Sequence, residues 1–155
     1  MLTETVAGRT YDYSHNVGRG AATGMGFANP VAMALDADGV VYVANRGSES
    51  ISNVPWDRTG VGQRISKVSL GSQMGEEEYL GEFSRYGSAP GQLIWPAGIV
   101  VDVQGQVYVT DEWLNRVSVF DAEGNFLSCW NISSPAKANP TGPRALPLMP
   151  TTPCS

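Results

Sequence analysis

Short apolar runs separated by turn residues recur along most of the chain. Between Asp102 and Asp121, Val107 and Val109 point to one side of an expected strand and Tyr108 points to the other. A strand that is apolar on both faces needs cover on both faces. The Asp-x-x-Gly spacing that precedes it suits a tight turn, because Asp can accept hydrogen bonds from the backbone ahead and Gly can adopt a positive φ. The pattern predicts antiparallel β-sheet, and it shows no convincing amphipathic helix.

The apolar pattern repeats itself when Pro30 is set on Pro96. Residues 30–45, PVAMALDADGVVYVAN, then lie over residues 96–111, PAGIVVDVQGQVYVTD. Two further strands follow in each copy, which the sequence places at 64–70, 79–86, 116–120 and 125–130. In this second part Arg64 lies over Arg116, so the first copy carries about 14 extra residues between its second and third strands. Four antiparallel strands that recur as a unit are typical of a propeller blade.

Residues 91–127 resemble an NHL repeat. The residues that carry the resemblance are Gly91-Gln92-Leu93, Pro96, Gly98-Ile99, Asp102, Gly105, Tyr108-Val109, Asp111, Asn115-Arg116-Val117 and Phe120-Asp121. The first copy is a degenerate match, because Ala32-Met33 replaces Gly-Ile and Asn45 replaces Asp. The resemblance covers about 27–130 and implies part of a β-propeller, usually six-bladed, from a family that binds proteins, RNA or small ligands. Related propellers include lyases and lactone hydrolases, so the fold alone does not decide the function.

We therefore predict an all-β partial propeller with two four-stranded antiparallel blades plus an N-terminal strand. Residues 1–26 are expected to supply the last strand and lead-in of a preceding blade, and 27–90 a degenerate NHL blade with a loop insertion. Residues 91–131 are expected to form an NHL blade, and 132–155 a Pro-rich disordered tail. Two blades leave two apolar faces open. The chain is accordingly expected to be a fragment of a six-bladed propeller, or to self-associate and close one.

The charge of the chain narrows the classes of partner. Ten Lys and Arg residues against fifteen Asp and Glu residues give a net charge of -5. Without a basic stripe, nucleic acid is not expected as a partner. The N-terminal residues lack the pattern of a signal peptide, and no apolar run approaches the roughly 20 residues that span a bilayer. No membrane partner is therefore expected, and the compartment stays undetermined.

The candidate ligand contacts lie in and beside the loops between the second and third strands of the two copies. They are Asn45, Arg46, Trp56, Asp57, Asp111, Glu112 and Trp113. Each loop places a Trp beside carboxylates, which combines a large contact area with charge that orients a ligand. The alternative is that Trp113 packs against a neighbouring blade and Trp56 anchors the long loop. By resemblance to NHL blades, Asp111 and Arg116 are expected to brace loops and neighbouring blades rather than to catalyse a reaction.

These residues favour an interaction module that binds a protein or small-molecule ligand through the face carrying the strand two–three loops. The alternatives are a fragment of a metal-dependent propeller enzyme, of lyase or lactonase type, and a truncated inactive gene product. A metal-dependent enzyme needs convergent His or carboxylate ligands, but His15 is the single His in the sequence. Nor does the sequence contain a Gly-x-Ser-x-Gly motif, a P-loop or a Cys–His pair. We therefore expect no catalytic residue, no metal site and no cofactor.

Overall fold

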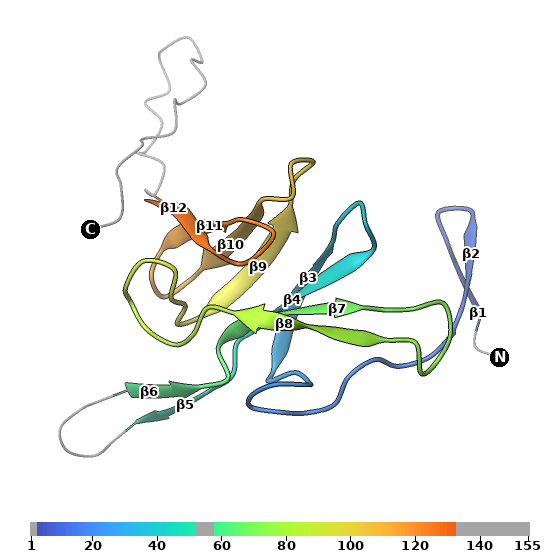
Figure 1. The fold of residues 1–155 in the computed structure, drawn as a ribbon, viewed down its shortest axis with the longest axis horizontal. Helices are drawn as coiled ribbons and strands as arrows, with labels where there is room; N and C mark the ends of the chain where they lie inside the picture. The colour runs from blue at the N-terminus through green and yellow to red at the C-terminus, as the bar shows by residue number, and fades with distance from the viewer. Residues whose placement is uncertain (1–2, 52–57, 133–155) are drawn as a thin grey trace, which may run out of the picture.

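The computed structural model describes residues 3–51 and 58–132, which contain strands and no helix (Figure 1). Two four-stranded antiparallel sheets form its centre. Blade 1 has the order β3 (Pro30–Leu35), β4 (Val40–Asn45), β7 (Arg64–Ser69) and β8 (Glu78–Phe83). Blade 2 has the order β9 (Pro96–Val101), β10 (Val107–Asp111), β11 (Arg116–Phe120) and β12 (Phe126–Asn131). The predicted all-β, propeller-like fold with two four-stranded blades is confirmed.

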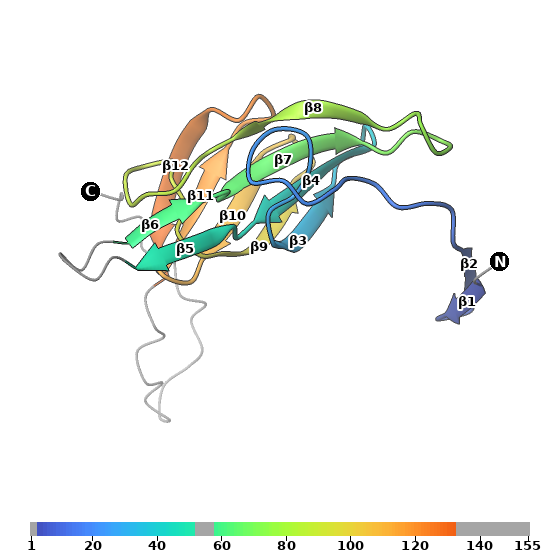
Figure 2. The ribbon, with the colours of Figure 1, turned by 90° about the horizontal axis from the view of Figure 1, so that it is seen from below.

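Two small hairpins accompany the blades. β1 (Thr3–Val6) pairs only with β2 (Arg9–Asp12), and this N-terminal hairpin projects away from the blades (Figure 2). β5 (Ser48–Ile51) pairs with β6 (Arg58–Val61) inside the insertion of the first repeat. The insertion therefore lengthens the connection from β4 to β7 as a β-hairpin. The expected Pro-rich tail falls outside the described residues from 133 onward.

The turns between the first two strands of each blade have the predicted chemistry. Oδ1 of Asp36 accepts hydrogen bonds from the amides of residues 38 and 40, at 2.9 and 2.8 Å. Oδ1 of Asp102 does the same with residues 104 and 106, both at 2.9 Å. Gly39 and Gly105 have φ values of 84° and 79°, a region that favours glycine. The Asp-x-x-Gly spacing thus encodes the same turn in both blades.

The repeat extends into the segment before each blade. These lead-in segments are residues 18–29 for blade 1 and residues 84–95 for blade 2. The same parallel bridge closes both of them, from Gly20 to Phe27 and from Tyr86 to Leu93. The bridge recurs in the alignment that sets Pro30 on Pro96, so the structural repeat begins well before the first strand of each blade.

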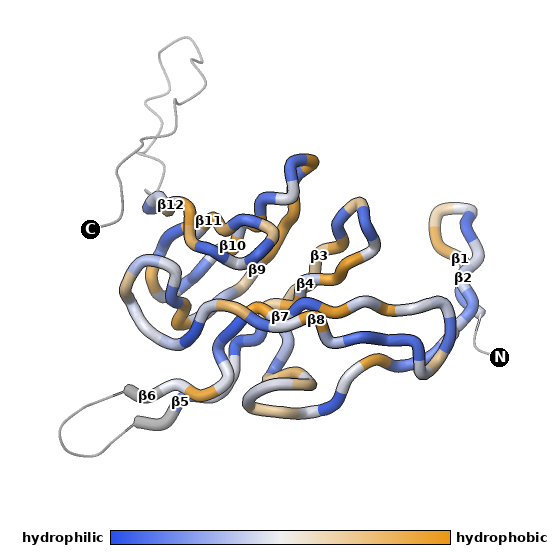
Figure 3. The backbone as a smooth tube through the Cα atoms, viewed as in Figure 1, coloured by the Kyte–Doolittle hydropathy of each residue, from blue (hydrophilic) through white to orange (hydrophobic). Residues whose placement is uncertain are grey.

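The two blades pack against each other through apolar side chains. Blade 1 contributes Tyr42, Ala44 and Ile65 to this interface, and blade 2 with its lead-in contributes Leu93, Val107, Val109 and Phe120. All seven are at most 1% exposed. The rings of Phe83 and Phe120 lie 5.0 Å apart across the interface. Figure 3 shows apolar residues along β3, β4 and β9, where the two sheets face each other. Burial of each large side chain contributes about 1.5–3 kcal/mol, so this interface stabilises both blades together.

A buried polar side chain at the end of the second strand ties each blade to its lead-in segment. In blade 2, Oδ2 of Asp111 accepts hydrogen bonds from the amides of Ile94 and Trp95, at 2.7 and 3.1 Å. In blade 1, Oδ1 of Asn45 accepts one from the amide of Ala28 at 2.9 Å. Asn45 and Asp111 are 0% and 1% exposed. Both are therefore parts of the fold, as the sequence indicated for Asp111.

An arginine at the start of the third strand holds the same lead-in segment in each blade. The guanidinium of Arg64 donates to the carbonyl oxygens of Ala22 (2.7 Å) and Gly26 (2.9 Å). At the matching positions of blade 2, the guanidinium of Arg116 donates to those of Ser88 (3.0 Å) and Gln92 (2.8 Å). Burial lowers the pKa of Arg116, while the negative charge of Asp111 acts in the opposite direction. The predicted bracing role of Arg116 fits these contacts, and Arg64 has the same role in blade 1.

We expect Asp111→Ala to lower the free energy of unfolding by roughly 3 kcal/mol, because it leaves the buried amide of Ile94 and the partly buried amides of Trp95 and Leu114 without their acceptor. Asp111→Asn keeps an acceptor oxygen for the amides of Ile94 and Trp95 but turns its NH2 group toward the amide of Leu114, so it should cost about 1–2 kcal/mol. Urea unfolding followed by circular dichroism measures both values.

The reciprocal change provides the control. Nδ2 of Asn45 donates to the carbonyl oxygens of Val43 and Arg64 and to the hydroxyl of Ser66, so Asn45→Asp would place a carboxylate oxygen against the two carbonyl oxygens. Asn45→Asp should therefore be more destabilising than Asp111→Asn. Equal costs for the two exchanges would contradict the assigned bonding.

Candidate functional site

The connections between the second and third strands lie at the same end of the blades as the lead-in segments. Asn45 pairs with both Pro30 and Arg64, and Asp111 pairs with both Pro96 and Arg116. The Asp-x-x-Gly turns lie at the other end of the first two strands. We call the end formed by the lead-in segments and by residues 46–51, 58–63 and 112–115 the loop face.

The structure divides the predicted site residues into three groups. Asn45 and Asp111 are buried and brace the fold, so their side chains do not line an open surface. Arg46, Glu112 and Trp113 lie together on the loop face. Trp56 and Asp57 lie outside the described residues, so their assignment stays a prediction.

Arg46 and Glu112 connect the loops of the two blades. Their side chains form a salt bridge of 3.2 Å, and they occupy equivalent positions in the two repeats. The guanidinium of Arg46 also lies over the ring of Trp95, at 4.8 Å from its centroid. Trp95 in turn contacts Trp113 edge-on at 5.0 Å. We call these four residues the arginine–tryptophan cluster, and it presents charged and aromatic groups on one surface.

The cluster remains accessible in spite of these contacts. Trp113 is 48% exposed, and the side chain of Glu112 is 59% exposed. Trp113 contacts Trp95 of its own blade's lead-in segment, and its packing against a neighbouring blade stays a prediction. Trp95 itself was not among the predicted site residues. Its position just before Pro96, in a lead-in segment, is the signal that could have identified it.

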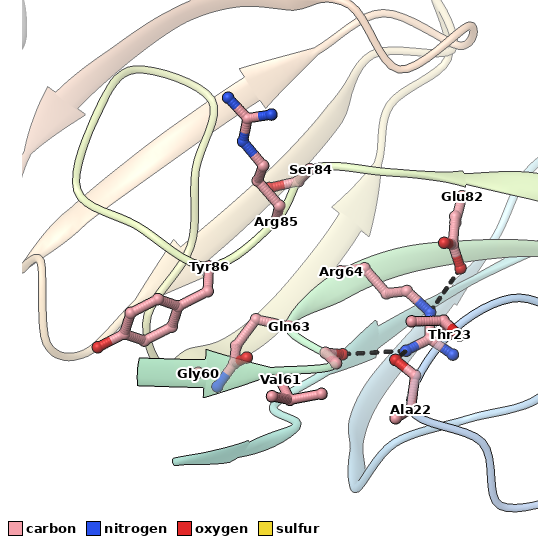
Figure 4. Close-up of a pocket in the computed structure, with 11 residues that line it drawn as sticks. Ala22, Thr23, Gly60, Val61, Gln63, Arg64, Glu82, Ser84, Arg85 and Tyr86 are labelled. Atoms are coloured by element: carbon pink, nitrogen blue, oxygen red, sulfur yellow. Dashed lines mark hydrogen bonds and ion pairs between the residues drawn. The ribbon is translucent and has the colours of Figure 1, made fainter. Parts of the chain in front are cut away.

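A pocket of about 570 Å³ opens on the same face (Figure 4). The residues that line it come from both lead-in segments, from β6 and from the adjoining ends of β7 and β8. They are Ala22, Thr23, Gly60, Val61, Gly62, Gln63, Arg64, Glu82, Ser84, Arg85 and Tyr86. This volume falls within the range of roughly 300–1000 Å³ that is typical of small-ligand sites. We call it the loop-face pocket.

One wall of the loop-face pocket is held by ionic and hydrogen-bonded contacts. Nε of Arg64 lies 2.7 Å from Oε2 of Glu82, as Figure 4 shows. The hydroxyl of Tyr79 donates to the same carboxylate oxygen at 2.7 Å. Burial, followed by this hydrogen bond and the negative charge of Glu82, raises the pKa of Tyr79 to about 12. Tyr79 is therefore a neutral donor at physiological pH, and the charges of Arg64 and Glu82 offset each other.

The opposite side of the pocket carries Arg85 and Tyr86. Arg85 is exposed and has no ion-pair partner among the described residues. The ring of Tyr86 lies so close to Gly60 that an added Cβ would overlap it. Gly60 therefore permits the insertion hairpin to approach the lead-in segment of blade 2 closely. Arg85 was missed in the sequence, although Arg19 occupies the equivalent position in the first repeat.

The described residues contain no group of three or more His, Cys, Asp or Glu side chains arranged to hold a metal ion. His15 lies in the N-terminal segment, where its Nδ1 is 2.7 Å from the hydroxyl of Ser14. Residues 3–51 and 58–132 contain no helix that is long and apolar enough to cross a membrane.

Three comparisons relate this chain to known proteins. A family model described as NHL repeat matches residues 93–120. Protein lin-41 of Caenorhabditis elegans is 50% identical to this chain over 46 residues, which are 30% of this chain and 4% of that protein. The solved structure of a gluconolactonase from Xanthomonas campestris is 18% identical, with a TM-score of 0.43, over 66% of this chain and 27% of that chain. The matched region therefore spans a small part of each relative. The family model identifies an NHL repeat at residues 93–120, from the lead-in segment of blade 2 to the end of β11.

Proposed function

We propose that this chain is an interaction module that binds a protein or small-molecule ligand through its loop face. The strongest support is the salt bridge between Arg46 and Glu112, which brings the loops of the two blades together at one accessible surface. The arginine–tryptophan cluster and the loop-face pocket both lie on this surface. Trp, Tyr and Arg are the residues most enriched among the energetically dominant contacts of binding surfaces.

The lining of the loop-face pocket indicates the chemistry of the ligand. Val61, Ala22 and the ring of Tyr86 offer apolar surface. Arg64 is neutralised by Glu82, whereas Arg85 supplies a positive charge without an ion-pair partner among the described residues. A ligand that places an apolar group in the pocket and an acidic group beside Arg85 would complement this lining. An acidic, partly apolar peptide segment of a partner protein has these properties.

The alternative of a metal-dependent propeller enzyme stays a prediction from the sequence. It would require at least some ligands from outside the described residues, which contain no group of three or more candidate ligands. The contacts on the loop face instead combine aromatic area with charge, which favours binding.

Peptides selected from a random phage-displayed library on the immobilised chain provide a probe for the loop face. We expect these peptides to be enriched in acidic residues next to apolar ones. Arg85→Ala should weaken the binding of a selected peptide at least about tenfold, or about 1.4 kcal/mol, because it removes the unpaired charge. Fluorescence anisotropy with a labelled peptide measures the dissociation constant.

Arg9→Ala is the matched control, since Arg9 is an exposed arginine in the N-terminal hairpin, away from the loop face. It should leave the affinity unchanged. The proposal fails if the two arginine variants lose affinity equally, or if neither changes it.

Trp113→Ala tests the arginine–tryptophan cluster separately from the pocket. Because Trp113 is half exposed, the variant should keep its circular dichroism spectrum. It should nevertheless weaken peptide binding at least about tenfold, since an accessible Trp provides a large contact area. Titration of the same labelled peptide measures this effect. An unchanged affinity in a folded variant would remove the cluster from the binding surface.

A further inference from the structure

Each blade has one face against the other blade and an opposite apolar face that, among the described residues, the other blade leaves open. The open face of blade 1, here called face A, consists of Phe27, Met33, Leu35, Val41, Val43 and Val68. Met33 and Leu35 are 73% and 62% exposed. The open face of blade 2, here called face B, consists of Val100, Tyr108, Thr110, Val117, Val119 and Trp130. Val100 is 57% exposed.

Face A matches the surface of blade 2 that packs on blade 1. The alignment of Pro30 with Pro96 places Phe27, Met33, Leu35, Val41 and Val43 over Leu93, Ile99, Val101, Val107 and Val109. The alignment of Arg64 with Arg116 places Val68 over Phe120. Every matched residue in blade 2 belongs to the interface between the blades or packs against it. Face A is therefore one half of an interface that the chain already forms internally.

Face B matches the other half of that interface. Tyr108, Thr110 and Val117 are equivalent to Tyr42, Ala44 and Ile65, the blade 1 residues at the centre of the interface. Trp130 pairs with Val117 in the register of blade 2, as Phe83 pairs with Ile65 in blade 1. The two open faces thus have the two complementary patterns that meet inside the chain.

We propose that face B of one copy packs on face A of a second copy, in the arrangement that blade 1 and blade 2 adopt within the chain. This contact is heterologous, because it joins different surfaces of identical chains. Each copy therefore still offers one free face after the first contact, and association proceeds head to tail until a ring closes.

The shape of face A supports this occupant. The N-terminal segment lies along part of face A, where Val41, Val43 and Val68 are 7%, 5% and 5% exposed. A hollow of about 410 Å³ lies between that segment and face A, so a second copy has to displace the segment in order to pack there. At the internal interface, Phe83 of blade 1 packs against Phe120, the residue equivalent to Val68. In the proposed contact, Trp130 of one copy takes the place of Phe83, and Val68 of the other copy takes the place of Phe120. The larger ring of Trp130 fills the space that the smaller side chain of Val68 leaves.

The charges at the rim of the interface agree with head-to-tail packing. Arg46 of blade 1 pairs with Glu112 of blade 2 inside the chain. In the proposed contact, Glu112 of one copy approaches Arg46 of the second copy. Positive and negative side chains then alternate from blade to blade along the loop faces of the associated copies. A symmetric contact between two copies of one blade would bring like charges together, which is unfavourable.

Two charge-introducing variants test the proposal, one on each face. Light scattering after size-exclusion chromatography should show the unaltered chain at whole multiples of 16.5 kDa above the monomer. Met33→Glu on face A and Val100→Glu on face B should each yield a monomer, with association weakened at least about 100-fold, because each buries an unpaired carboxylate in the contact. An equimolar mixture of the two variants should form a dimer of twice 16.5 kDa and no larger species, since one intact face remains on each.

Val103→Glu is the matched control, because Val103 is 94% exposed in the turn after β9 and belongs to neither face. It should associate like the unaltered chain. Circular dichroism verifies the fold of each variant, and Leu35→Glu or Val100→Lys replaces a variant that does not fold.

Three results would overturn the proposal. The first is an unaltered chain that stays monomeric at all concentrations. The second is association that survives either single substitution, which would indicate a symmetric or unspecific contact. The third is a mixture of the two folded variants that forms no dimer.

Discussion

The packing of one apolar sheet face on another positions every other feature of this molecule. Tyr42, Ala44 and Ile65 of blade 1 are buried only because blade 2 covers them. A sheet that is apolar on both faces cannot be stable alone, since repeat units bury their core against neighbours. The interface also places the loops of the two blades next to each other. The salt bridge between Arg46 and Glu112 depends on that placement, because its partners lie in different blades.

The second constraint is the attachment of each lead-in segment to its own blade. Arg64 and Arg116 each direct their guanidinium to backbone carbonyl groups that a loop would otherwise expose to water. Asn45 and Asp111 satisfy amides of the same segments from the other side. These contacts hold the walls of the loop-face pocket in place without using Arg85, which stays available for a ligand. Asp111 and Arg116, which carry the resemblance to the NHL repeat, thus stabilise the fold. The candidate binding groups, such as Arg85, lie beside them.

The repeating parts of the fold could be predicted from the sequence because their signals are local. The Asp-x-x-Gly turns, the alternation around Tyr42 and Tyr108, and the register between the copies all follow from residues close together in the chain. The site was predicted less completely. The contact of Arg46 with Trp95 joins residues of different repeats, and nothing in the local pattern indicates it. The β-hairpins in the insertion and at the N-terminus also differ from the loop and single strand that their composition suggested. Both lack the strong apolar alternation that identified the other strands.

Blade 1 and blade 2 stabilise each other through the interface in which Phe83 meets Phe120. A double-mutant cycle with Phe83→Leu and Phe120→Leu tests it most directly, because contacts of either ring within its own blade cancel in the cycle. Urea unfolding of the four proteins should give a coupling free energy of about 0.5–1.5 kcal/mol between the two rings. Additive effects of the two substitutions would show that the rings do not meet, and would contradict the packing of the two blades described above.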